Sequence, residues 1–84
     1  MVKHFAFALA DRGIRVNAVA PGLIARDSED EIKTNQRRER ASAMQAFKRL
    51  AQPEEIGGVV AFLASDDAHC TTGDIVRVDG GSKL

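Results

Sequence analysis

The chain has 84 residues, of which 44% are hydrophobic and 29% charged, and its formal net charge is zero. This composition excludes a disordered or fibrous chain, and a neutral surface offers no field that would gather nucleic acid or an anionic membrane. The single cysteine, Cys70, excludes a disulfide-stapled scaffold and fits a reducing, cytoplasmic compartment, and the longest apolar stretch, 56–64, is far shorter than the roughly 20 residues that cross a bilayer.

The first part of the chain predicts the end of a helix followed by a strand. Residues 1–10 are rich in apolar side chains and contain neither Gly nor Pro, as in the last turns of a packed helix. Gly13 can take the left-handed conformation that closes a helix. Residues 14–20 are β-rich and bounded by glycine and proline, which predicts a strand. Apolar residues occupy both odd and even positions of this strand, which indicates that both of its faces are buried, as in parallel sheets.

Residues 23–50 form a polar insertion. Ser28 followed by Glu31 matches a capping box and predicts the start of a helix. Basic residues further along the segment suit the negative end of the dipole of such a helix. We expect the charged run 37–40 to be a solvated helix face, and the alternative is a contact with a phosphate. Apolar positions are sparse before residue 44, so we expect a segment able to act as a lid.

The last part of the chain predicts a second helix and a second strand. Residues 53–64 begin with proline and two acids, which favour a helix start, and carry apolar residues on one face. Gly57 and Gly58 inside this helix predict the close approach of another backbone. Residues 74–78 predict the second strand. The order of helix, strand, polar insertion, helix and strand predicts an α/β fold.

Five segments, taken together, resemble the last third of the short-chain dehydrogenase/reductases, a family of NAD(P)-dependent oxidoreductases. They are Gly13 to Gly22, Gln52 to Ile56, Phe62 to Ala68, Thr72-Gly73 and Val78 to Gly81. The resemblance implies the C-terminal fragment of a Rossmann-type, doubly wound parallel sheet. The predicted strands would be its last two, and the 53–64 helix would be the crossover that parallel strands require.

The resemblance also implies a cofactor, NAD or NADP. In the family the loop after the Pro-Gly strand end lies against the nicotinamide ring, and Pro21, Gly22 and Ile24 match these cofactor-binding positions. Gly22 could admit a flat ring because it has no Cβ. The alternative is a plain turn that ends the strand. Arg26 stands where the family usually has a threonine, so the nicotinamide contact is in doubt there, and an arginine could meet a phosphate or an acidic substrate.

No catalytic residue is predicted. The family uses a tyrosine phenol with a nearby lysine for proton transfer, and this chain contains no tyrosine. It also lacks the glycine-rich turn that seats a pyrophosphate. His4, His69 and Cys70 have no partner motif and are expected to be structural or solvent-facing, and we expect no metal site. We therefore expect a partial enzyme, inactive alone.

Alternatives remain open. The chain could be a non-enzymatic interaction module that binds itself or a full-length relative, or a gene remnant, which a Tyr-x-x-x-Lys codon run upstream of Met1 would reveal. In the family the 53–64 helix and the 74–78 strand commonly make oligomer contacts. The final Ser82-Lys83-Leu84 matches a peroxisomal address, the alternative to a cytoplasmic location. Because the 14–20 strand would keep an unpaired edge, we expect self-association.

Overall fold

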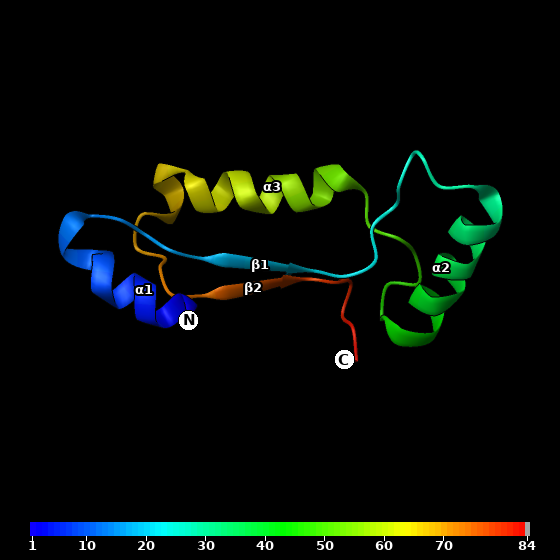
Figure 1. The fold of residues 1–84 in the computed structure, drawn as a ribbon, viewed down its shortest axis with the longest axis horizontal. Helices are drawn as coiled ribbons and strands as arrows, with labels where there is room; N and C mark the ends of the chain where they lie inside the picture. Colours follow the sequence, from blue (N-terminus) through cyan, green and yellow to red (C-terminus); the bar gives the residue numbers. More distant parts are fainter. Residues whose placement is uncertain (84) are drawn as a thin grey trace.

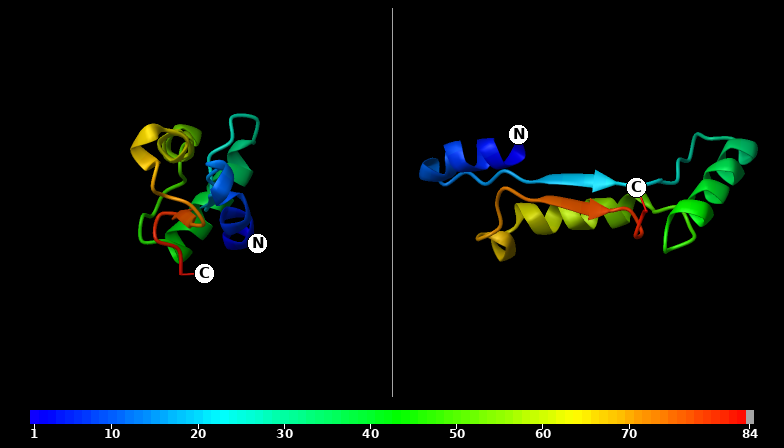
Figure 2. Two further views of the ribbon diagram at one scale, coloured as in Figure 1. Left: turned by 90° about the vertical axis from the view of Figure 1, so that its left-hand side faces the viewer. Right: turned by 90° about the horizontal axis from the view of Figure 1, so that it is seen from below.

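The computed structural model describes residues 1–83 and shows two parallel strands between helices (Figure 1). The elements in chain order are α1 (Val2–Leu9), a 3₁₀ turn (Ala10–Arg12), β1 (Ala18–Pro21), α2 (Glu31–Met44), α3 (Pro53–Ala64), a second 3₁₀ turn (Asp66–Ala68) and β2 (Ile75–Val78). Helices α1 and α3 lie on opposite faces of the strand pair, and α2 lies beyond the carboxyl ends of the strands (Figures 1 and 2). The predicted α/β class is confirmed. The tripeptide read as an address ends at Leu84, outside the described residues.

The sheet is a single parallel pair. Its register runs from Ala18 opposite Ile75 to Pro21 opposite Val78. The long connection through α2 and α3 is what a parallel pairing requires, because the chain must return to the same end of the sheet. Within residues 1–83 each strand has one neighbour, so each also has an open edge.

Strand β1 is shorter than predicted and lies later in the chain. The pattern predicted residues 14–20, but the strand spans Ala18–Pro21. Before it, the backbone N–H of Val16 donates to the Thr72 hydroxyl at 3.0 Å. The Asn17 side chain bridges the turn before β2, donating to one carbonyl at 2.9 Å and accepting from one N–H at 3.1 Å. Among residues 1–83, only one backbone bond crosses this segment, from the Gly73 N–H to the Val16 carbonyl at 2.7 Å, and side chains make the other contacts, so the regular ladder begins late.

Arg15 closes the carboxyl end of α3. Its guanidinium donates to the carbonyl oxygens of Leu63 at 2.7 Å, Ser65 at 3.3 Å and Thr71 at 3.3 Å. The last carbonyls of a helix have no partner within the helix, and a cation also complements the negative end of its dipole. One side chain before β1 therefore anchors the helix that precedes β2.

Helix α2 begins at a different cap from the predicted one. Asp30, not Ser28, is the N-cap, and its carboxylate accepts from the N–H of Lys33 at 2.8 Å. The carboxylate of the preceding residue, Glu29, pairs with Arg37 at 3.0 Å, and both side chains are largely buried. The predicted capping box was wrong because an aspartate closer to the helix satisfies its first-turn amide.

Helix α3 spans Pro53–Ala64, the same residues as the predicted helix. Its start is capped by the Glu55 carboxylate, which accepts from the N–H of Gln52 at 3.0 Å. The close backbone approach predicted at Gly57 and Gly58 is not found: a Cβ on either glycine would meet nothing within 4 Å. Both glycines face open space among the described residues.

The core is thin. The buried apolar side chains are Ala6, Ala41, Leu50 and Ala68. The accessible surface is 6312 Å², compared with about 4900 Å² for a compact chain of this mass. The radius of gyration is 15.6 Å, compared with about 12 Å for a compact domain of this length.

The two-sided burial predicted for the first strand is incomplete, since its residues Ala18 to Ala20 are half-buried. Across residues 1–83, no helix is both long and apolar enough to cross a membrane.

Candidate functional site

The carboxyl ends of the two strands form the candidate site. The Gly22 N–H donates to the Val78 carbonyl at 3.1 Å, and beyond this bond the two chains diverge. Open α/β sheets bind ligands at this end of their strands because loops leave there and space opens between them. Two cavities, of about 110 and 340 Å³, lie at this end.

Gly22 is packed closely by its own chain. A Cβ on Gly22 would lie 2.9 Å from the Cα of Asp79 and 3.1 Å from the Gln45 side-chain oxygen. No side chain fits at such distances from a backbone atom. The fold therefore supplies a reason for glycine at this position that is independent of any ligand.

The sequence-predicted cofactor residues are only partly brought together. Pro21 and Gly22 both line the larger cavity. Ile24 lines neither cavity and instead forms an isolated parallel bridge with Ala51. That bridge is flanked by a hydrogen bond from the Ala51 N–H to the Leu23 carbonyl at 2.9 Å. Ile24 thus lies where the chain enters the polar insertion, joined to the segment that leaves the insertion.

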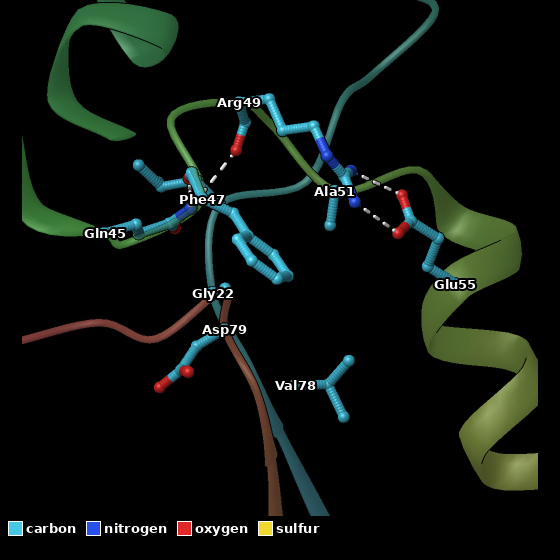
Figure 3. Close-up of a pocket in the computed structure, with 10 residues that line it drawn as sticks. Gly22, Gln45, Phe47, Arg49, Ala51, Glu55, Val78 and Asp79 are labelled. Carbon is cyan, nitrogen blue, oxygen red and sulfur yellow. Dashed lines mark hydrogen bonds and ion pairs between the residues drawn. The ribbon is translucent and has the colours of Figure 1, made fainter. Parts of the chain in front are cut away.

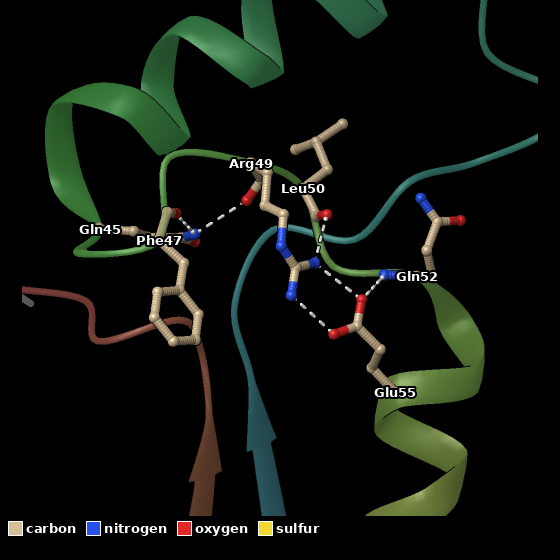
Figure 4. Close-up of polar contacts among 6 residues, drawn as sticks. All are labelled: Gln45, Phe47, Arg49, Leu50, Gln52 and Glu55. Atoms are coloured by element: carbon tan, nitrogen blue, oxygen red, sulfur yellow. Dashed lines mark hydrogen bonds and ion pairs between the residues drawn. The ribbon is translucent and has the colours of Figure 1, made fainter.

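Gln45 holds the linker between α2 and α3. It is a buried polar residue with 7% exposure. Its side-chain amide donates to the carbonyl oxygens of Phe47 at 3.0 Å and Arg49 at 3.1 Å (Figure 4). Sequence reasoning missed Gln45, because nothing in the local pattern distinguishes it from the other polar residues of the insertion.

The residues after β2 dock on the same linker. The N–H groups of Ala46 and Phe47 donate to the carbonyls of Gly81 at 3.0 Å and Gly80 at 2.9 Å, and the Lys83 N–H donates to the Met44 carbonyl at 2.9 Å. Both glycines have left-handed φ values, 64° and 76°, which side chains rarely adopt. The Gly-Gly pair therefore turns the chain so that it can pair with the end of the predicted lid.

Asp79 fixes this turn. One carboxylate oxygen accepts from the N–H groups of Gly81 at 3.1 Å and Ser82 at 3.3 Å, and the other pairs with Arg77 at 2.7 Å. Burial acts to raise the pKa of Asp79, but these hydrogen bonds and the positive charge outweigh it and hold the pKa below its ordinary value. Asp79 is thus a charged structural anchor, not a proton carrier.

A bidentate ion pair closes the smaller cavity. The Arg49 guanidinium donates to both carboxylate oxygens of Glu55, at 2.8 and 2.9 Å (Figure 3). The Arg49 hydrogen bond, with that from the Gln52 N–H, lowers the pKa of Glu55 to about 2. Arg49 also lies 5.8 Å from the centre of the Phe47 ring, which points into the cavity. These charges bind each other, so this cavity presents mainly apolar surface.

The two cavities are neighbours at the strand ends and share part of their lining. Val78 lines the smaller cavity, whereas Ala20, Pro21 and Arg77 line the larger one. Four residues line both cavities: Gly22, Leu23, Gln45 and Asp79. The larger cavity also receives Arg40 and Met44 from α2.

Comparison with known proteins gives the family. The family described as enoyl-(acyl carrier protein) reductase matches residues 1–83. The chain belongs to the short-chain dehydrogenase/reductase family. It is 39% identical over 84 residues to glucose 1-dehydrogenase 2 of Bacillus subtilis, and 43% identical over 84 residues to dehydrogenase/reductase SDR family member 4 of Bos taurus. It covers 33% and 30% of those proteins, so it spans about a third of their length.

Solved short-chain dehydrogenase/reductase structures show the same fold. The angucycline C-6 ketoreductase LanV with bound NADP is 39% identical, with a TM-score of 0.82, over 95% of this chain and 31% of that chain. A 4-hydroxyisoleucine dehydrogenase mutant complexed with NADH and succinate is 26% identical, with a TM-score of 0.85, over 98% of this chain and 34% of that chain. The Rossmann-type resemblance is thus confirmed in three dimensions.

The histidines, the cysteine and Arg26, which the sequence analysis singled out, lie outside the two cavities at the strand ends. His4, His69 and Cys70 are exposed, and residues 1–83 contain no group of three potential metal ligands. Arg26 is exposed near the start of α2, where it lines a separate cavity with Lys33. It lies outside both cavities at the strand ends.

Proposed function

We propose that this chain forms the part of a short-chain dehydrogenase/reductase that faces the nicotinamide and the substrate, and that it has no turnover by itself. The observation that carries the proposal is the Pro21-Gly22 strand end beside a 340 Å³ cavity, in a chain with no tyrosine. In this proposal the chain is the C-terminal part of the family fold, and it works together with the remaining two thirds that its relatives possess.

The cavity fits part of a dinucleotide. Its volume of about 340 Å³ lies at the lower end of the range for small-molecule sites. That space suits a nicotinamide ring with a small substrate. A whole NAD or NADP also needs a pyrophosphate seat, and these 84 residues contain no glycine-rich turn that opens a helix. Two similar solved structures hold NADH and NADP, which supports the same cofactor class here.

Hydride transfer belongs to the nicotinamide, and the protein supplies orientation and a proton. The chain's own residues supply orientation but no proton donor. Pro21 and Gly22 would orient the ring, and α2 would exclude water above the strand ends. Reduction of a carbonyl also requires a proton at the new hydroxyl, which the family takes from a tyrosine. Without that phenol, hydride transfer has no matched proton donor.

Kinetics of the purified chain test the proposal. We expect no oxidation of NADH or NADPH with a panel of ketones and aldehydes, whereas full-length glucose 1-dehydrogenase 2 of Bacillus subtilis should turn over its sugar under the same conditions. Nicotinamide mononucleotide should shift the backbone amide resonances of Gly22 and Leu23 weakly, because both residues line the cavity. Steady carbonyl reduction by a preparation free of longer homologues would refute the proposal.

A second candidate, a non-enzymatic interaction module, is favoured by a different observation. Exposed apolar side chains lie on α3 and β2, including Val60, Phe62 and Ile75, which are 49–57% exposed. These are the elements expected to contact another copy or a full-length relative. The same titration separates the candidates, because a pure interaction module should show no saturable response to the nicotinamide nucleotide.

A further inference from the structure

The larger cavity beside Pro21 carries an uncompensated positive charge. We infer that it selects a substrate with an apolar body and one carboxylate, and that Arg40 binds the carboxylate. The inference rests on the proposed function, because it names the substrate class of the same site.

The body of the cavity is apolar. Its lining includes Ala20, Pro21 and Leu23 from the strand end, and Met44 from the last turn of α2. A ligand that covers such surface gains free energy in proportion to the apolar area removed from water. Methionine also adapts to ligands of varied shape, since its side chain is unbranched and flexible. The site therefore favours an aliphatic or flat apolar group.

The charges of the lining do not cancel. Two arginines, Arg40 and Arg77, face one carboxylate, Asp79, so the lining carries one net positive charge. Arg77 pairs with Asp79 at 2.7 Å and also donates to the Ser82 carbonyl at 3.0 Å. Both carboxylate oxygens of Asp79 are therefore already occupied by bonds within the chain.

Arg40 is the lining cation that is available to bind a ligand. Within the described part of the chain, residues 1–83, its guanidinium makes no hydrogen bond and no ion pair. It lies four residues before Met44, so the two side chains share one face of α2. An arginine fork binds a carboxylate through two parallel hydrogen bonds, which fixes the orientation of the ligand as well as its charge.

The other arginines of residues 23–50 do not line this cavity. Arg37 pairs with Glu29, and Arg49 pairs with Glu55. Arg38 lines a different cavity, beside Lys48. Arg38 is thus a matched control: it has the same charge and lies in the same helix, but it does not line the proposed site.

Ligand titrations of the 84-residue chain test the inference without any cofactor. The probes are hexanoate, hexanol and hexylamine, which share an apolar body and differ in charge. Amide chemical shifts and the midpoint of thermal unfolding are followed together, because a ligand that binds the folded state raises that midpoint even in a marginally stable chain. Hexanoate should shift the Leu23 and Met44 amides and raise the midpoint, and hexanol should bind more weakly.

Variants then assign the charge. Arg40→Gln should weaken hexanoate binding by about threefold to tenfold, and Arg38→Gln should leave it unchanged. Arg40→Glu should reverse the preference, so that hexylamine binds better than hexanoate. Equal binding of hexanoate and hexanol, no response to hexanoate, or equal effects of the two glutamine variants would overturn the inference. Because no turnover is measured, such a failure is distinct from a failure of the proposed function.

Discussion

At the scale of single residues, glycines in this chain have opposite roles. A Cβ on Gly22 would collide with the Asp79 backbone at 2.9 Å, whereas one on Gly57 would meet nothing within 4 Å. Gly22→Ala should lower the free energy of unfolding by about 1–3 kcal/mol, the usual cost of overpacking. Gly57→Ala should raise it by about 0.5–1 kcal/mol, because alanine favours a helix. Urea denaturation followed by circular dichroism measures both, and equal effects would contradict the packing described for Gly22.

The Arg49–Glu55 pair predicts a pH dependence of stability. The pKa of Glu55 is lowered from 4.5 to about 2 in the folded chain. A carboxylate with a lowered pKa stabilises the fold at pH values above its unfolded pKa, and the stabilisation is lost as the pH falls from about 4.5 towards 2. The urea midpoint should therefore fall over this range, and Glu55→Gln should reduce the fall. Glu54→Gln is the control, and an effect equal to that of Glu55→Gln would contradict the assignment.

At the scale of elements, Arg15 joins the segment before β1 to the end of α3. Arg15→Gln should lower the free energy of unfolding by about 1–3 kcal/mol, because three part-buried carbonyl contacts lose their charged donor. Arg12→Gln, an exposed change in the turn after α1, should cost less than about 0.5 kcal/mol. Urea denaturation compares them. Amide exchange should also quicken in the last turn of α3 in the Arg15 variant alone.

Elements marked by local chemistry were predictable from the sequence. Helix α3 has a proline and two acids at its start, and the turn after α1 ends at Gly13, whose φ of 71° is the predicted left-handed cap. Contacts between distant segments were not predictable. The late start of β1 depends on Asn17 reaching residues 71 and 74, and no local pattern encodes that reach. The unpaired charge of Arg40 and the buried amide of Gln45 were hidden for the same reason.

At the scale of the whole molecule, the open shape of the chain predicts self-association. Its longest dimension is 49 Å and its shortest 18 Å. Met1 and Phe7 on α1 are 93% and 89% exposed, and each strand keeps an open edge among residues 1–83. Exposed apolar side chains and unpaired backbone groups both favour association.

The open edge of β1 gives a specific test of that association. The N–H groups of Ala18 and Gly22 donate towards β2, so the alternate N–H of Val19 faces the open edge. Val19→Pro removes this donor, and Val19→Ala removes the same side chain but keeps the donor. Size-exclusion chromatography with light scattering should show association of the wild-type chain and of Val19→Ala, and less association of Val19→Pro. A wild-type chain that runs as a compact monomer would contradict the prediction.

Residues 80–83 pair with the end of α2, and this pairing connects two segments that lie far apart in the sequence. The helix that would cover a substrate is fastened by the segment that follows the last strand, through the main chain of Ala46, Phe47 and Lys83. Substitutions at Gly80 or Gly81 that break this pairing should therefore change how α2 covers the proposed substrate site. Selectivity at such a site can change through the backbone that holds the covering helix, as well as through the side chains that line the cavity.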